Sequence, residues 1–173
     1  MATLSAVHVS FSQPIPELTA RRPQSGSEIL FALPEIARPS SSAERWASYV
    51  LGACRSDRDP RTLGIWARQV GVSYTTLCES CRLIEVQPRY ARDFARILRL
   101  VVIPAFDSRQ LATFLDISDR RTLDSILQKA GFKHNGTFSE HVSVSSFLEH
   151  QKFIAHENTG FRIVRDVFAS TQA

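Results

Sequence analysis

Apolar residues recur at helical spacing through most of the chain after residue 41. Ser41 and Glu44 have the spacing of a capping box, in which two side chains satisfy backbone amides at a helix start. Because the residues behind them repeat every three or four positions, they predict an amphipathic helix with one buried face. That face would consist of Trp46, Ala47, Val50, Leu51 and Cys54.

Two further helices are predicted on either side of a short turn. The first begins at Asp59-Pro60, because Asp is a favourable cap and Pro suits the first helical position, and it runs to about Val70. Gly71 ends it, since a tight turn needs a residue that tolerates positive φ. Ser73 then caps the next helix, which extends to about Leu83. This layout predicts a helix–turn–helix whose second helix has one free face.

Packing between these two helices constrains the residue types. Ala67 is small, so that the second helix can approach it closely. The wedge between the helices would be filled by Trp66, Val70, Val72 and Leu77. By helical spacing, the outward positions of the second helix are Tyr74, Thr75, Cys78, Glu79 and Arg82.

A fourth helix is predicted from Pro88 to residue 103. Its apolar face holds Tyr90, Phe94, Ile97 and Val101, with Ala91 and Leu98 beside them. Arginines step by three or four residues along the opposite side, at Arg89, Arg92, Arg96 and Arg99. This stripe has two interpretations. It is either the solvated face of an amphipathic helix or a ridge that follows DNA phosphates, whose contacts depend on charge.

Residues 104–156 are expected to repeat this layout. A helix over 108–115 and a turn over 116–118 precede a second helix to Ala130, which Arg120 and Arg121 open. Asn135-Gly136 favours a two-residue hairpin turn, so that residues 132–138 form either a small β-hairpin wing or an ordinary loop. Residues 143–156 are expected to form a further helix.

The two ends of the chain differ from this helical part. Residues 1–41 contain five prolines among Ser and Gly and have no helical period, which predicts a flexible arm. Its segment 28–37 is apolar enough to dock on the domain or on a partner.

The predicted fold is all-α and has four parts. They are an arm (1–41), a first helix–turn–helix unit with a linker helix (42–103), a second such unit (104–156) and a tail (157–173). The tail contains an apolar element at 161–168.

Charge and composition narrow the class of protein. The net charge is +4 and the pI about 9.3, which is compatible with nucleic acid. Most basic residues are arginine, whose planar guanidinium binds phosphate and guanine through paired hydrogen bonds better than lysine does. A GC-rich genome also favours arginine. No apolar run approaches the ~20 residues that span a bilayer, and no signal peptide is recognisable. The sparse, odd number of cysteines predicts a protein of the reducing cytoplasm.

Few residue patterns in the chain indicate a metal site or an enzyme. Cys78 and Cys81 are three residues apart on a helix, but structural zinc usually needs four ligands, and neither Cys54 nor the histidines have fitting positions. Cys81 is expected in the core, and Cys78 outside as a possible target of oxidation. Nucleophile-elbow, P-loop, zinc-protease and dinucleotide motifs are lacking. We therefore expect no catalytic residues, no metal and no cofactor.

Residues 43–100 resemble the first half of the DNA-binding domain of AraC/XylS-type transcription regulators. The similarity rests on Trp46, Leu63, Ala67, Gly71-Val72-Ser73, Thr76-Leu77, and a Pro88-initiated linker helix ending in Arg99-Leu100. The resemblance implies that the helix after Ser73 reads DNA. The second unit departs from the family, because Asp116 stands where a turn glycine would be.

Two functions are consistent with these expectations. The first is a small transcription regulator that binds double-stranded DNA through Ser73, Tyr74, Thr75, Cys78, Arg82, Arg89, Arg92, Arg96, Arg120 and Arg121. The alternative is a protein–protein interaction module on the same scaffold, docking on a regulator or polymerase. In either case the proline-rich arm or the C-terminal tail would bind a protein partner or close a homodimer.

Overall fold

The computed structural model describes residues 36, 38–102, 115, 117–130, 143–151, 154–155 and 157–171. Within these residues the secondary structure is helical and contains no strand. An all-α fold is therefore confirmed for the described part. The helices are α2 (Ser42–Arg55), α3 (Leu63–Gln69), α4 (Tyr74–Leu83), α5 (Pro88–Val102), α7 (Arg120–Lys129), α8 (Val144–His150) and α9 (Thr159–Thr171).

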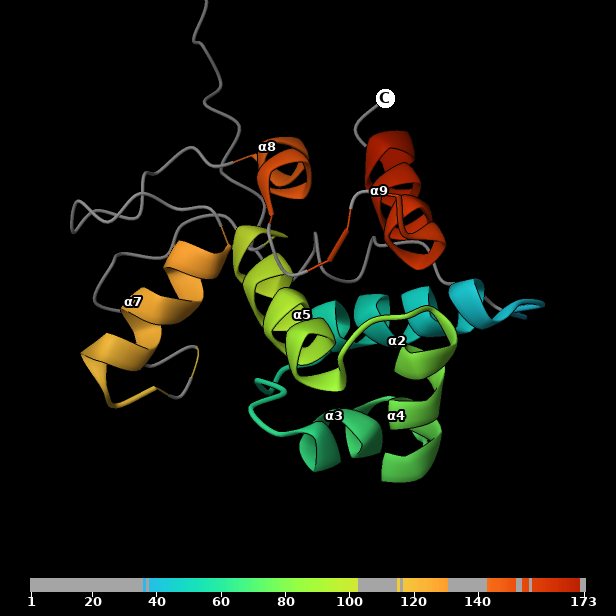
Figure 1. Cartoon of the computed structure of the whole chain (residues 1–173), viewed down its shortest axis with the longest axis horizontal. Coiled ribbons are helices and arrows are strands. Elements are labelled where there is room, and N and C mark those ends of the chain that lie inside the picture. The colour runs from blue at the N-terminus through green and yellow to red at the C-terminus, as the bar shows by residue number, and fades with distance from the viewer. Residues whose placement is uncertain are drawn as a thin grey trace, which may run out of the picture.

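The helices are arranged around α2 and α5, which cross at the centre of the molecule (Figure 1). Helices α3 and α4 pack against one side of this pair, and α8 and α9 against the other. Helix α7 lies beside α5, on the side away from α9. The central pair therefore buries more than one face of each of its helices.

Several predicted helix boundaries are confirmed. At the start of α2, the Ser41 hydroxyl accepts a hydrogen bond from the Glu44 amide at 3.1 Å, and the Glu44 carboxylate accepts one from the Ser41 amide at 3.2 Å. All five residues of the predicted buried face of α2 are buried. Helix α5 begins at Pro88 as expected. Local sequence thus sets these boundaries, as capping chemistry requires.

Helix α8 is shorter than the predicted helix over 143–156. It ends at His150, because Gln151 adopts an extended backbone and its side chain bonds to the backbone of Ile154. The Gln151 amide group donates to the Ile154 carbonyl at 2.6 Å and accepts from the Ile154 amide at 2.9 Å. This buried glutamine replaces the helical hydrogen bonds that would otherwise continue.

An aromatic cluster joins four helices at the core. Phe94 of α5 stacks on Trp46 of α2 and on Phe147 of α8, with ring centroids 6.2 and 5.8 Å apart. It also meets the edge of Phe161 of α9 at 5.8 Å. Each aromatic pair of this kind contributes about 0.5–1.5 kcal/mol beyond its area burial. Helices α2, α5, α8 and α9 therefore share one core.

The C-terminal segment differs from the expected tail. Residues 159–171 form a helix whose apolar side chains Phe161, Val164 and Phe168 are buried. Gly160 lies against the Trp46 ring so closely that an added Cβ would come within 2.6 Å of it. The apolar face that was expected to remain available to a partner is thus part of the fold. The sequence period indicates an amphipathic segment but does not identify what covers it.

Several predicted features lie outside the described residues. They are most of the arm 1–41, the apolar segment 28–37 apart from Ile36, the helix 108–115 apart from Leu115, and the hairpin or loop at 132–138.

Replacing Gly160 with alanine tests whether α9 is part of the core. The new methyl group would collide with Trp46, so we expect Gly160→Ala to lower the free energy of unfolding by about 1–3 kcal/mol. Gly64→Ala is the matched control, because a Cβ there meets nothing within 4 Å and alanine favours a helix by up to about 1 kcal/mol. Urea denaturation followed by circular dichroism measures both. Equal unfolding midpoints would contradict the packing of α9 on α2.

Candidate nucleic-acid interface

Helix α3 begins later than Asp59-Pro60 predicts. Thr62 is the cap, and its hydroxyl accepts from the Ile65 amide at 3.2 Å, so that the first helical residue is Leu63. The expected capping role of Asp59 is wrong because its carboxylate, with 4% of the side chain exposed, points into the protein. Asp is a good cap only where no stronger partner competes for its oxygens, and here arginines do.

The turn after α3 follows the expected geometry. Gly71 has φ +72°, which a residue with a Cβ adopts at a cost. Its amide donates to the Arg68 carbonyl at 3.3 Å, and the Val72 amide donates to the Ala67 carbonyl at 2.9 Å. These two bonds form a Schellman motif, which satisfies the last carbonyls of α3. The Ser73 hydroxyl then accepts from the Thr76 amide at 3.0 Å and caps α4.

The inner face of α4 is held firmly. Leu77, Ser80 and Cys81 are buried. The partner helix α3 contributes Ala67, which is 2% exposed, and Trp66, whose indole N–H donates to the Tyr49 carbonyl of α2 at 3.0 Å. The predicted packing of Trp66, Ala67 and Leu77 is confirmed. Because the inner face is fixed, the orientation of the outer face is fixed as well.

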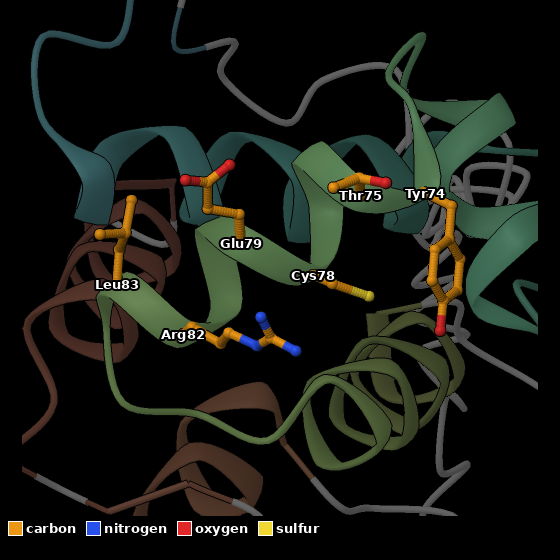
Figure 2. Close-up of a pocket in the computed structure, with 6 residues that line it drawn as sticks. All are labelled: Tyr74, Thr75, Cys78, Glu79, Arg82 and Leu83. Atoms are coloured by element: carbon orange, nitrogen blue, oxygen red, sulfur yellow. The ribbon is translucent and has the colours of Figure 1, made fainter.

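The outer face of α4 forms a shallow hollow of about 600 Å³ (Figure 2). Four predicted outward residues are exposed and Cys78 is half-buried. The hollow also includes Leu83, which is 58% exposed and was not predicted. Leu83 lies four residues after Glu79, so helical register alone would have placed it on this face. The lining residues are Tyr74, Thr75, Cys78, Glu79, Arg82 and Leu83.

The end of α4 is joined to the start of α9. Glu85 has φ +60°, a conformation usually occupied by glycine, and the Val86 amide donates to the Cys81 carbonyl at 2.9 Å. The Asn158 side-chain amide donates to the Ile84 carbonyl at 2.5 Å, while its oxygen accepts from the Phe161 amide. The C-terminal segment therefore helps to position α4, a role that the sequence pattern does not reveal.

The arginine stripe of α5 is only partly at the surface. Arg89 is exposed, and Arg92 is half-buried and bonded to Asp93. Arg96 and Arg99 are only 5% and 2% exposed. Neither interpretation of the stripe holds for these two residues, and Arg96 is wrong as a predicted DNA contact.

Asp59 explains why the two arginines are buried. The Arg96 Nε donates to the Asp59 carboxylate at 2.9 Å, and another Arg96 nitrogen donates to the Leu115 carbonyl. Arg99 lies 3.9 Å from the same carboxylate and donates to the Ser56 carbonyl at 3.0 Å. Burial lowers the pKa of Arg99, and the Asp59 charge opposes that shift. One carboxylate thus joins the loop before α3 to α5.

Excess positive charge is confined to one part of the chain. Residues 42–102 contain ten arginines and six carboxylates, whereas residues 1–41 contain three basic and three acidic residues and residues 103–173 contain eight of each. The net charge of +4 therefore comes entirely from α2 to α5 and their connections. The exposed arginines of this part are Arg45, Arg58, Arg61, Arg68, Arg82 and Arg89.

Helix α7 carries the remaining predicted arginines. Asp119 caps it by accepting from the Arg121 and Thr122 amides at 3.2 and 3.1 Å. The hydrogen bond from the Thr122 hydroxyl, followed by these amides, holds the pKa of Asp119 below its usual range. Arg120 and Arg121 are exposed, with Arg120 4.0 Å from Asp124. Neither arginine lines the hollow on α4.

The cysteine pair is divided between the core and the surface. Burial raises the pKa of both Cys54 and Cys81 to about 12. Cys78 lies on the outer face of α4, where its hydrogen bond with Tyr74 raises the pKa of that phenol. Among the described residues, no group of three or more His, Cys, Asp or Glu side chains could hold a metal ion.

Comparisons with protein-family models, curated proteins and solved structures find no match to this chain. None of the helices in the described part of the chain is long and apolar enough to cross a bilayer.

Replacing Asp59 with asparagine tests the buried ion pairs. The change removes the negative charge between two buried guanidinium groups, so we expect the free energy of unfolding to fall by about 3–5 kcal/mol. Asp166→Asn is the control, since the Asp166 side chain is exposed on α9 and is not among the groups that act on Arg99, and its change should stay within about 0.5 kcal/mol. Chemical denaturation measures both variants. Similar losses for the two would show that the Asp59 carboxylate has no special role.

Thiol labelling tests the division of the cysteines. A thiol reagent at pH 8 should modify Cys78 quickly in the native protein, because Cys54 and Cys81 are buried and their pKa of about 12 leaves little thiolate. The other two thiols should react only after urea unfolds the protein. Cys78→Ser should remove the fast phase, and a fast phase that persists in this variant would place another cysteine at the surface.

Proposed function

We propose that this protein is a small DNA-binding transcription regulator, in which α3, the turn at Gly71 and α4 act as a helix–turn–helix. The observation that carries the proposal is the outer face of α4. It presents Thr75, Glu79 and Arg82 to solvent from a helix whose opposite face is fixed in the core. An α-helix of this kind fits the major groove of B-DNA.

The residues at the start of α4 suit this role. In helix–turn–helix proteins the N-terminal residues of the second helix contact base edges. Tyr74 and Thr75 occupy these positions and are exposed. The resemblance to AraC/XylS-type regulators implies that the same helix enters the groove, which supports the assignment independently of the surface.

Electrostatics supports DNA as the partner. All of the excess positive charge belongs to the part of the chain that contains α4. Arg68 lies one helix before α4 and Arg89 one helix after it, and both are exposed. Such arginines would anchor phosphates, which supplies affinity without sequence preference.

A second reading unit is part of the proposal. Helix α7 would make additional contacts through Arg120 and Arg121, which are exposed at its start. In this arrangement the two units form a tandem, with α5 as the linker helix between them. Contacts from α7 would extend the site along the duplex.

A protein partner is the alternative, and one observation favours it. Tyr74 and Leu83 expose 57% and 58% of their surfaces at the two ends of α4. Exposed aromatic side chains are enriched in protein interfaces, and exposed apolar patches mark interaction sites. The same helix would then dock on a regulator or polymerase instead of on DNA.

Salt dependence distinguishes the two partners. Fluorescence anisotropy with a random duplex should show binding that weakens steeply between low and physiological salt, because bound phosphates release counterions. Arg82→Ala should weaken binding by about 1–3 kcal/mol if the guanidinium contacts a base. Circular dichroism would check that the variant remains folded.

Arg162→Ala is the matched control for this experiment. It removes the same charge from an exposed position on α9, away from the hollow, and should leave binding nearly unchanged. No binding at low salt, or equal effects of the two substitutions, would argue against α4 as a DNA-reading helix.

A further inference from the structure

Two opposite charges on the outer face of α4 do not pair with each other. Glu79 and Arg82 are three residues apart, a spacing at which such side chains commonly form an ion pair. Among the described residues, neither side chain makes an ion pair or a hydrogen bond. Figure 2 shows the carboxylate and the guanidinium on opposite edges of the face. Both groups are therefore available to a ligand.

The chemistry of the two groups matches the two bases of one kind of base pair. In the major groove, guanine presents two acceptors that an arginine fork can bind together, and cytosine presents an amine that a carboxylate can accept. Adenine also has an amine, but its neighbouring N7 is an acceptor and would repel a carboxylate. Thymine has no donor on this edge. Glu79 and Arg82 thus complement cytosine and guanine.

The spacing of the two residues also fits. Three residues of α-helix rise about 4.5 Å along the axis. Successive bases on one strand are about 3.4 Å apart. Both side chains can therefore reach neighbouring base pairs.

We propose that α4 selects sites in which the cytosine bound by Glu79 lies in the base pair next to the one whose guanine is bound by Arg82. This inference rests on the proposed function, since it requires α4 to lie in the major groove. Glu79 would favour the correct sequence and also disfavour incorrect ones. It gains a hydrogen bond at cytosine, and its charge is repelled by phosphates wherever that bond is missing.

Glu79→Gln provides the sharpest test, because an amide reads a different base. Glutamine binds adenine through two hydrogen bonds, so that the preference at this position should change from cytosine to adenine. The experiment selects bound sequences from a random duplex pool with the full-length wild type and with the variant. Enrichment should shift by roughly tenfold or more at one position, while the neighbouring guanine is retained.

Glu85→Gln is the matched control. It removes the same charge just beyond the end of α4, from a residue that does not line the hollow. Both variants should bind random duplex more tightly than the wild type, but Glu85→Gln should select the same sequence as the wild type. Arg82→Ala should lose the guanine and keep the cytosine.

The outcomes separate this inference from the proposed function. If the wild type binds DNA but Glu79→Gln selects the same bases, the inference is overturned and α4 remains a DNA-binding helix with other contacts. If the wild type retains no duplex at low salt, both the inference and the proposed function fail. In that case the hollow on α4 would be a surface for a protein partner.

Discussion

The buried carboxylate of Asp59 is the interaction on which the rest of this structure depends. It meets Arg96 and Arg99 of α5, and the same arginines reach the Ser56 and Leu115 carbonyls. Removing three charges from water is costly, and the ion pairs and hydrogen bonds among these groups offset part of that cost. These bonds therefore join α5 to the loop before α3 and to Leu115, which precedes α7 in the chain.

The surrounding helices hold α4 in a fixed orientation, with its outer face exposed to solvent. Since α5 turns Arg96 and Arg99 inward, they cannot contact a ligand directly, and the guanidinium groups that reach solvent belong to exposed arginines such as Arg68 and Arg82. Helix α4 is fixed along its inner face and at its end by Asn158. A preorganised helix loses little entropy on binding, which suits a helix that is proposed to read DNA.

Most of the candidate site could be predicted from the sequence, because helical register determines which side chains share a face. Tyr74, Thr75, Glu79 and Arg82 were expected outward and are exposed. Leu83 belongs to the same face by register, although it is also the last residue of the helix. The burial of Arg96 is not predictable for a different reason. Register shows that it lies opposite the apolar face of α5, but not that a second layer of protein covers that side.

The sequence by itself determined the features that depend on neighbouring residues. The capping box at Ser41, the Ser73 cap, the turn at Gly71 and the free face of α4 follow from local hydrogen bonding and backbone geometry. Only the tertiary structure decided what covers each helix. Asp59 became an ion-pair partner instead of a cap, and the C-terminal segment became a core helix against Trp46. These outcomes depend on contacts between residues far apart in the chain, and local sequence patterns do not predict such contacts.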